Sequence, residues 1–408
     1  MIKKENCSIC NNPDISEIIN LGLSPPANNF VANKEDKVEM YPLIVDYCDK
    51  CYCIQLRHCL SESELYSHYT YSTPNASSLT KHYHDILEKI HAYGISNVNN
   101  KCIEIGSNNG NLLKYLEPYF SKVLGVDPAE NISKIAINQG VETEVNFFSD
   151  KLAKDISNKY GKFQLGIARH MFAHNNNPKK LMKAMGELLD ENGIFIIENA
   201  YALDTFENGE FDQIYHEHMF YYSLSNIDLL VKEFGFEVSD VFFSKVHGGS
   251  ATFFCSREGK IPIKAIVNEA LNKEAESFKG KEIFNKFSKK IFHNKREIQK
   301  IIAEESANHK IIGAYGAPAK AFTLFSFFEL DFHNIKFCVD TTPTKIGNYF
   351  PNYKIPVISE GSLKDTDYDM LIVNAWNYKE EILAKSKKIF KKGTKLLFPI
   401  PQIEVYEV

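Results

Sequence analysis

The sequence predicts an α/β protein with a small cysteine-rich head at its N-terminus and a second α/β lobe at its C-terminus. Short apolar runs of strand length alternate with helix-like stretches from about residue 100 to about residue 200, and the alternation returns after residue 311. This βαβ pattern is typical of a parallel sheet with helices on both faces. Six of the nine cysteines fall within the first 59 residues, which distinguishes the head from the rest of the chain.

The elements follow in a definite order. A helix is predicted from Ser77 to Tyr93, and strands in "KCIEI", "VLGVD", "FQLGIAR" and "GIFIIENA". The stretch "FGFEVSDVFFSKVHGGSATFFCS" predicts a terminal antiparallel pair. Apolar residues recur at helical spacing through the Lys- and Glu-rich residues 266–310, which predicts helices there. We therefore expect a head over 1–65, a first α/β domain over 66–262, a helical connection over 263–310 and a Rossmann-like lobe over 311–408.

Composition narrows the classes of function. The 408 residues suggest two or three domains, and the net charge of -5 does not favour nucleic acid as a partner. We expect no membrane span, because the chain lacks an apolar run of about 18 residues. The polar start "MIKKENCSICNNPD" lacks the apolar centre of a signal peptide. We expect a cytoplasmic monomer.

The first cysteines form two CxxC pairs, Cys7 with Cys10 and Cys48 with Cys51. Each pair can supply two thiolates to a tetrahedral Zn²⁺, and two pairs complete a closed structural site. The alternative is that these are buried cysteines paired by accident. We expect structural zinc.

A glycine loop follows the first strand of the central region, in "CIEIGSNNGN". It is not the G-x-G-x-x-G of nicotinamide binding. The acidic Asp127 ends the next strand, where it can accept hydrogen bonds from both hydroxyls of a ribose. Since no P-loop lysine follows, the loop favours an adenosine-bearing cation, S-adenosylmethionine, over an ordinary strand–turn–helix. The candidate cofactor-binding residues are Glu104, Gly106, Asn108, Asn109, Asp127 and Arg169.

The segment "FDQIYHEHMFYYS" concentrates proton-handling side chains after the strand "GIFIIENA". His216 and His218 do not have the i, i+4 spacing of a helical zinc pair. The segment lies at the carboxyl edge of the sheet, where open α/β sheets bind ligands. "ARHMFAH" brings His170 and His174 to the same edge. An acid–base site and a polar surface loop both remain open at this point.

Together these motifs resemble a known family. CxxC…CxxC, "EIGSNNGN", "ARHMFAH", "IYHEHMFYYS", "VHGGS" and "GAYGAPAKA", in that order, are similar to the sugar C-methyltransferases that act at C3 of nucleotide-linked 4-keto-deoxysugars. The resemblance spans nearly the whole chain. It implies a zinc-binding head, a class I S-adenosylmethionine-methyltransferase core, a Rossmann-like C-terminal domain, and a nucleotide-diphospho-deoxysugar substrate methylated through a base-assisted enolate.

The resemblance also assigns roles to residues. His218 resembles the general base, Tyr215 and Glu217 its helpers, His174 a second active-site histidine near the C4 oxygen, and Tyr69 a tyrosine that lines the site. The substrate-binding candidates are Tyr71, His216, His247, Tyr315, Gly316, Lys320 and Asp340. Two departures from the family pattern bear on the identity of the sugar more than on the reaction: Ala251-Thr252 follow "HGGS" where the family often has Leu-Arg, and Ala321 follows "GAPAK" where it often has Gly.

The loop "GAYGAPAK" of the C-terminal lobe joins a strand to a predicted helix start. Free N–H groups at a helix start can bind a diphosphate, and Lys320 would add charge. The alternative is a lobe that only buttresses the first domain. Three other activities compete with C-methylation: a zinc-stabilised binding protein without catalysis, an O-methyltransferase on the same scaffold, and, ranked last, an NAD-dependent oxidoreductase.

Overall fold

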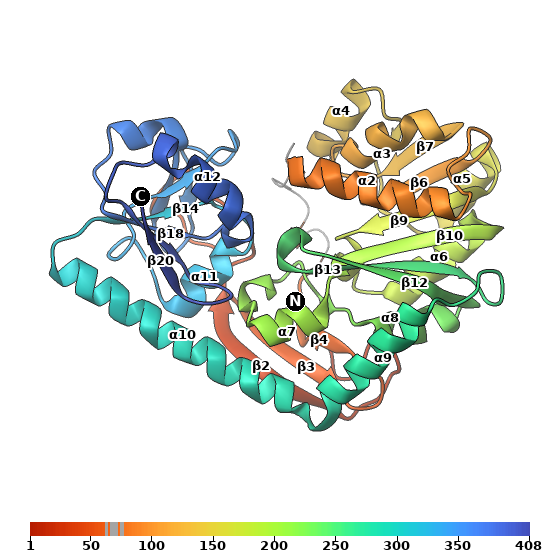
Figure 1. Cartoon of the computed structure of the whole chain (residues 1–408), viewed down its shortest axis with the longest axis horizontal. Coiled ribbons are helices and arrows are strands. Elements are labelled where there is room, and N and C mark those ends of the chain that lie inside the picture. Colours follow the sequence, from red (N-terminus) through yellow and green to blue (C-terminus); the bar gives the residue numbers. More distant parts are fainter. Residues whose placement is uncertain (62–63, 66–71, 74–76) are drawn as a thin grey trace. The chain divides into compact units, whose positions relative to one another are not determined.

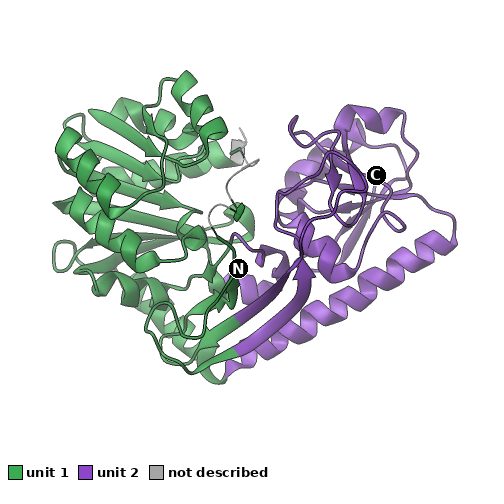
Figure 2. Ribbon diagram, turned by 180° about the vertical axis from the view of Figure 1, so that it is seen from behind, with its two compact units in different colours: residues 1–16, 46–203, 218–280 green, residues 17–45, 204–217, 281–408 purple. Residues whose placement is uncertain are grey.

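The computed structural model describes residues 1–61, 64–65, 72–73 and 77–408. The chain forms two compact units (Figure 2), and each is assembled from separate stretches of sequence. Unit 1 comprises residues 1–16, 46–203 and 218–280, and unit 2 comprises residues 17–45, 204–217 and 281–408.

Unit 1 is built on a seven-stranded sheet of order β12-β13-β10-β9-β6-β7-β8. The strands are β6 (Lys101–Ile105), β7 (Lys122–Val126), β8 (Thr143–Glu144), β9 (Phe163–Arg169), β10 (Leu189–Ala200), β12 (Phe236–Ser244) and β13 (Ser250–Arg257). Strands β6 to β10 pair in parallel. The pairing of β13 with β10 and with β12 is antiparallel, which confirms the predicted terminal pair.

Helices cover both faces of this sheet, with α2, α3 and α4 on one face and α6 and α8 on the other (Figure 1). The helices of unit 1 are α2 (Ser77–Ala92), α3 (Asn111–Leu116), α4 (Glu130–Asn138), α5 (Asp150–Tyr160), α6 (Pro178–Leu188), α8 (Leu224–Lys232) and α9 (Ala265–Phe278). Leucines and isoleucines at helical spacing on α2 pack with α3 against the apolar centre of the sheet. This packing is why the predicted helix from Ser77 forms.

Unit 2 contains a second seven-stranded sheet, of order β16-β17-β15-β14-β18-β19-β20. Its strands are β14 (Ile312–Tyr315), β15 (Cys338–Asp340), β16 (Tyr349–Phe350), β17 (Ile355–Ser359), β18 (Met370–Val373), β19 (Lys395–Phe398) and β20 (Glu404–Glu407). The five central strands are parallel, as predicted for a Rossmann-like lobe, and the two edge strands are antiparallel. The helices are α10 (Glu282–Ala307), α11 (Ala321–Phe328) and α12 (Lys379–Ile389).

The remaining elements belong to the N-terminal region and to the segment after β10. β1 (Ile2–Lys3) pairs with β5 (His58–Cys59). A four-stranded sheet has the order β11-β4-β3-β2, from β2 (Ile15–Ser24), β3 (Tyr41–Cys48), β4 (Ile54–Leu56) and β11 (Phe220–Tyr221). The chain passes from one unit to the other within β2, within β3 and within α7 (Ala202–Asn208). Among the described residues, no helix combines the length and apolar character needed to cross a membrane.

Candidate active site

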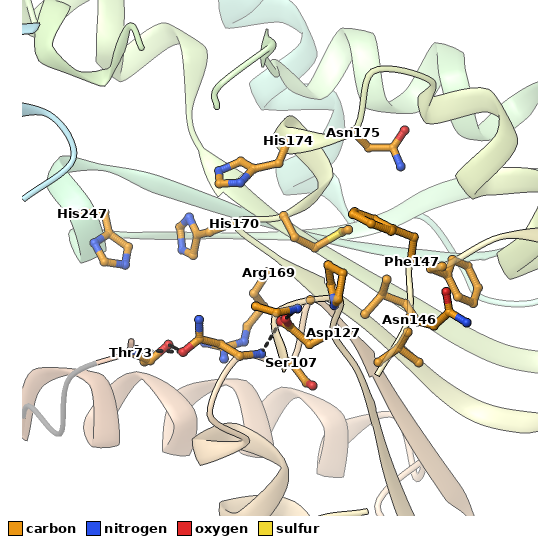
Figure 3. Close-up of a pocket in the computed structure, with 18 of the residues that line it drawn as sticks. Thr73, Ser107, Asp127, Asn146, Phe147, Arg169, His170, His174, Asn175 and His247 are labelled. Atoms are coloured by element: carbon orange, nitrogen blue, oxygen red, sulfur yellow. Dashed lines mark hydrogen bonds between the residues drawn. The ribbon is translucent and has the colours of Figure 1, made fainter. Parts of the chain in front are cut away.

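A cavity lies in unit 1 at the carboxyl ends of β6, β7 and β9 (Figure 3). Parallel strands end at the same edge of a sheet, so the loops after these strands meet there. The cavity is lined by the glycine loop after β6, by residues 126–129 at the end of β7 and by residues 169–171 at the end of β9. Of the candidate cofactor residues, it brings together Gly106, Asn108, Asp127 and Arg169.

Asp127 is held rigidly at the end of β7. Its Oδ2 accepts the backbone N–H of Asn108 (2.8 Å), and its Oδ1 accepts that of Ala129 (2.9 Å). Burial raises the pKa of this carboxyl, while the two N–H groups act to lower it. Each carboxylate oxygen retains a second acceptor direction. Asp127 can therefore accept the two hydroxyls of a ribose in the cavity.

The glycine loop approaches its neighbours too closely for a side chain at Gly106. This residue has φ +70°, and a Cβ there would lie 2.6 Å from the Cβ and Cγ atoms of Met171. Asn108, two residues further along the loop, is fixed by Thr73. The backbone N–H and the hydroxyl of Thr73 both donate to Oδ1 of Asn108 (2.8 and 3.1 Å). Asn109 points elsewhere: its Nδ2 donates to the carbonyl of Thr73 (2.8 Å), and it is not among the lining residues.

The far wall of the cavity is apolar and aromatic. Phe147, which is 42% exposed, and Asn146 lie on the side opposite the labelled histidines (Figure 3). Their neighbour Phe148 also lines the cavity. An apolar aromatic wall beside a fixed carboxylate fits adenosine, which presents a flat ring next to a ribose diol. The residues present therefore fit S-adenosylmethionine.

Glu104 and Arg169 form a buried ion pair across neighbouring strands β6 and β9. The Nε of Arg169 donates to Oε1 of Glu104 (3.0 Å). Burial raises the pKa of Glu104 to about 7, although Arg169 lowers it. The guanidinium also lies over the ring of Tyr83 on α2, 5.0 Å from the centroid. Of this pair, Arg169 lines the cavity and Glu104 lies behind it as its partner.

Histidines from three segments gather at one end of the cavity (Figure 3): His170 after β9, His174 of the 3-10 turn Phe172–His174, and His247 of the turn Val246–Gly248. The ring of His174 lies 5.1 Å from that of His218, between centroids. Burial lowers the pKa of His174 to about 3. His174 is therefore a neutral imidazole near pH 7 that lines the cavity and lies beside His218.

Residues 211–217 belong to unit 2. Nδ2 of Asn28 donates to Oε1 of the buried Glu217 (2.9 Å), and the buried ring of His216 meets Tyr41 edge to face. Tyr215 is half-buried. These contacts place the segment among the residues of unit 2, while His218 begins the next stretch of unit 1.

The loop after β14 uses its polar groups internally. The N–H of Gly316 donates to the carbonyl of Val339 (2.8 Å), and that of Ala317 to Oδ2 of Asp340 (2.7 Å). Tyr315 donates its hydroxyl to Oε2 of Glu360 (2.6 Å). Each of these three loop donors thus already has an acceptor, and Asp340 is the acceptor of Ala317.

Lys320 of the same loop is directed to a buried pair. Its Nζ lies 3.5 Å from Oδ2 of Asp212 and 4.1 Å from the centroid of the Trp376 ring. The indole Nε1 of Trp376 donates to the same carboxylate oxygen (2.6 Å). The ammonium group is therefore neutralised by Asp212 within unit 2.

Four cysteines form the metal centre of the head. The Sγ atoms of Cys7, Cys10, Cys48 and Cys51 all lie within 4.8 Å of one another. Tetrahedral Zn²⁺ with bonds of about 2.3 Å would separate its sulfurs by about 3.8 Å, which this cluster allows. Each CxxC turn closes in the same way, since the N–H four residues after its first cysteine donates to that cysteine's carbonyl.

Two predicted site residues lie outside the described part of the chain, and three cavity residues were not predicted. Tyr69 and Tyr71 lie outside the described residues. Sequence reasoning did not identify Asn146, Phe147 or Thr73 as cavity residues. The segment "VNFF" follows the short strand β8, so the rule that sites form where parallel strands end was the available signal.

Comparisons with known proteins agree with this architecture. Family models match in order a zinc binding domain over residues 7–66, a methyltransferase domain over residues 77–241 and a C-methyltransferase C-terminal domain over residues 245–401. The C-methyltransferase NovU of Streptomyces niveus is 29% identical over 406 residues, which cover 98% of this chain and 96% of that protein.

Solved structures match a smaller part of the chain. An S-adenosylmethionine-dependent methyltransferase of Clostridium acetobutylicum covers 45% of this chain and 94% of its own at 18% identity, with a TM-score of 0.36. The match to magnesium protoporphyrin IX methyltransferase of Synechocystis covers 46% of this chain and 88% of that protein, at 13% identity and with a TM-score of 0.35.

One kind of enzyme accounts for the three matched domains, the cavity around Asp127 and the four-cysteine centre. Its cofactors are S-adenosylmethionine and a structural zinc ion. The chain is an S-adenosylmethionine-dependent methyltransferase with an N-terminal zinc-binding domain, and over nearly its whole length it is similar to the C-methyltransferase NovU.

Proposed function

We propose that this C-methyltransferase methylates C3 of a nucleotide-linked 4-keto-6-deoxysugar through base-assisted formation of an enolate. The observation that carries the proposal is the imidazole pair of His174 and His218, in which His174 lines the cofactor cavity and the rings lie 5.1 Å apart. A carbon next to a ketone becomes a nucleophile when a base removes its proton. The motifs that resemble the sugar C-methyltransferases supply the substrate class.

Each residue has a defined task in this proposal. His218 takes the C3 proton, and His174 lies near the C4 oxygen as a neutral donor, because burial lowers the pKa of its imidazole to about 3. Tyr215 and Glu217 assist at the sugar, with Glu217 held by Asn28. Bound S-adenosylmethionine supplies the electrophilic methyl group. Asp127 and Phe147 hold its adenosine, and Gly106 leaves room for close approach of the loop.

The test is methylation of TDP-, CDP- and GDP-linked 4-keto-6-deoxysugars with S-adenosylmethionine, followed by mass spectrometry and NMR of the product. A parallel incubation with S-adenosylhomocysteine in D₂O measures deuterium exchange at C3 without methyl transfer. We expect a C-methyl product, and a loss of about 10²- to 10⁴-fold in methylation and exchange in His218→Asn. His84→Asn is the matched control, since His84 is exposed on α2.

The same experiment separates the alternatives. A methyl group on oxygen, without exchange at C3, would identify an O-methyltransferase. Full activity of His218→Asn would remove His218 from the role of base. No product from any of these sugars, with S-adenosylmethionine still bound, would refute the substrate class while leaving the C-methyltransferase assignment intact.

A further inference from the structure

A buried carboxylate beside the cavity has no part in the mechanism so far. Glu198 lies near the end of β10, and its side chain is fully buried. Its Oε1 lies 2.8 Å from Nε2 of His82 on α2 and 3.2 Å from Nε2 of His170. Burial alone would raise the pKa of Glu198, but hydrogen bonds from His170 and His82 outweigh it and hold the pKa well below its ordinary value. Glu198 is therefore an anion that two imidazoles share.

The two imidazoles differ in what else they can reach. The ring of His82 is buried and stacks on Phe242, which encloses it in the protein. The side chain of His170 is 26% exposed and lines the cofactor cavity. Because Nε2 of His170 is directed to Glu198, its Nδ1 is the nitrogen left for another partner. This is the arrangement by which a carboxylate orients a reactive histidine.

The backbone conformation of His170 also indicates a functional role for this residue. Its φ is +51°, a conformation uncommon for a residue other than glycine. The N–H of His170 donates to the carbonyl of Glu198 (2.7 Å), which fixes this turn. His247 also has a positive φ, +56°, and its ring meets that of His170 edge to face at 4.6 Å between centroids. Strained residues of this kind concentrate at functional sites.

We infer that His170, oriented by Glu198, is a second catalytic residue of the reaction, whose Nδ1–H donates a hydrogen bond to the oxygen of the enolate. The inference rests on the proposed function, because it requires an acceptor with a carbonyl next to the methylated carbon. His174 cannot supply a cationic donor, since it stays neutral near pH 7. His170 has an anion beside it that balances the charge of an imidazolium.

The step is balanced as follows. The C3–H bond of the sugar breaks, its proton passes to His218, and the electron pair forms the C3–C4 double bond while negative charge develops on the C4 oxygen. The Nδ1–H of His170 donates a hydrogen bond to that oxygen and keeps its proton. As the carbonyl re-forms, C3 bonds to the methyl carbon, the sulfur–methyl bond breaks, and sulfur keeps the electron pair. His218 then releases its proton to solvent.

The test compares three variants in the two assays described above. His170→Asn removes the imidazole with a residue that tolerates positive φ. Glu198→Gln keeps a hydrogen-bond acceptor without the charge, and His84→Asn is the control. We expect His170→Asn to lower both kcat and C3 exchange about 10²- to 10³-fold, the loss typical of one oxyanion donor. The affinity for S-adenosylmethionine and the melting temperature should stay near those of the wild type.

The pH dependence of kcat distinguishes orientation from mere support of the fold. The charged and titratable groups around His170 are Glu198, His82, His247, His174 and the Arg169–Glu104 pair. If His170 must be protonated, kcat declines above a certain pH, and Glu198→Gln should move that decline to lower pH. His84→Asn should leave it in place.

The outcomes separate the two proposals. If the wild type turns over a 4-keto sugar and His170→Asn stays within about twofold of it in both assays, only the role of His170 is overturned. The twofold limit is a small fraction of the loss expected for an oxyanion donor. An unchanged pH profile in Glu198→Gln would overturn the role of Glu198 as the positioning residue. If Glu198→Gln does not fold, His170→Asn alone decides. Failure of the wild type on all sugars refutes the proposed function, and the enolate role falls with it.

Discussion

At the scale of single residues, the burial of Glu210 predicts how the stability of the protein depends on pH, independently of catalysis. It is 1% exposed in unit 2, and burial together with the nearby Asp212 raises its pKa from 4.5 to about 8. The folded protein therefore binds this proton more tightly than the unfolded chain. The stabilising contribution is complete below pH 4.5 and is lost as the pH rises through 8. We expect wild-type stability to fall across this window by a few kcal/mol.

The measurement is thermal unfolding of wild type and Glu210→Gln from pH 4.5 to 8.5. Glutamine keeps the acceptor for Nδ2 of Asn208 (3.1 Å) but cannot ionise. Glu210→Gln should therefore gain stability relative to wild type as the pH rises. Glu207→Gln, an exposed position on α7, is the control. Parallel pH curves for wild type and Glu210→Gln would show that Glu210 is not protonated in the folded state.

Sequence reasoning placed some site residues better than others for a physical reason. Asp127 follows a strand at a spacing that depends only on the local chain, and it lines the cavity. The partner of Glu104 depends on β9 lying beside β6, which no local pattern specifies. The pairing of His82 with Glu198 joins residues 116 positions apart. Such contacts require the tertiary fold.

At the scale of the element, the structure of the glycine loop predicts that alanine at two different glycines of unit 1 changes the affinity for the cofactor to different extents. Gly106 has φ +70° and Gly94 has φ +67°, so alanine is strained at both. Only at Gly106 would the new Cβ meet side-chain atoms within 3 Å, namely those of Met171. We expect Gly106→Ala to lower the affinity for S-adenosylmethionine at least about tenfold, or about 1.4 kcal/mol. Gly94→Ala should leave it unchanged.

Isothermal titration of both variants with S-adenosylmethionine provides the comparison. Melting temperatures measured alongside give the cost of the positive φ, which the two variants share. Equal affinities in Gly106→Ala and Gly94→Ala would mean that Met171 moves aside without disturbing the cofactor. The close contact would then have no role in holding the loop.

Local pattern sufficed for most elements. The strands, the helix from Ser77, the terminal antiparallel pair and the helices within 266–310 all formed as predicted, because each has its own apolar periodicity. The four-cysteine centre followed from spacing alone. Which helix covers which face, and which loop residues reach the cavity, follow from the order of strands in the sheet.

At the scale of the whole molecule, unit 2 is completed by segments far from its main stretch of sequence. Phe30 packs its ring edge to face on Phe322 and Phe350, at 5.1 and 4.9 Å between centroids. The hydroxyl of Thr323 donates to the carbonyl of Ile214 (2.7 Å). Residues 17–45 and 204–217 thus cover apolar surface of the C-terminal sheet and its helix α11. Boundaries drawn along a linear sequence cannot represent such a unit.

The assembly of unit 2 from three stretches predicts that residues 281–408 do not fold by themselves into the structure they have in the full chain. Without residues 17–45 and 204–217, the aromatic residues of α11 lose Phe30 and Phe211, and Trp376 loses its acceptor Asp212. Trp376 is the single tryptophan of the chain and is buried, so its fluorescence reports on this packing. We expect the fragment 281–408 to emit at longer wavelength than the full chain and to lack a cooperative melting transition. Asp212→Asn in the full chain is the matched variant, and it should retain buried emission because the surrounding aromatic residues remain. A fragment that melts cooperatively with the emission of the full chain would show that the lobe is autonomous, and that the two distant segments are added to a fold already stable without them.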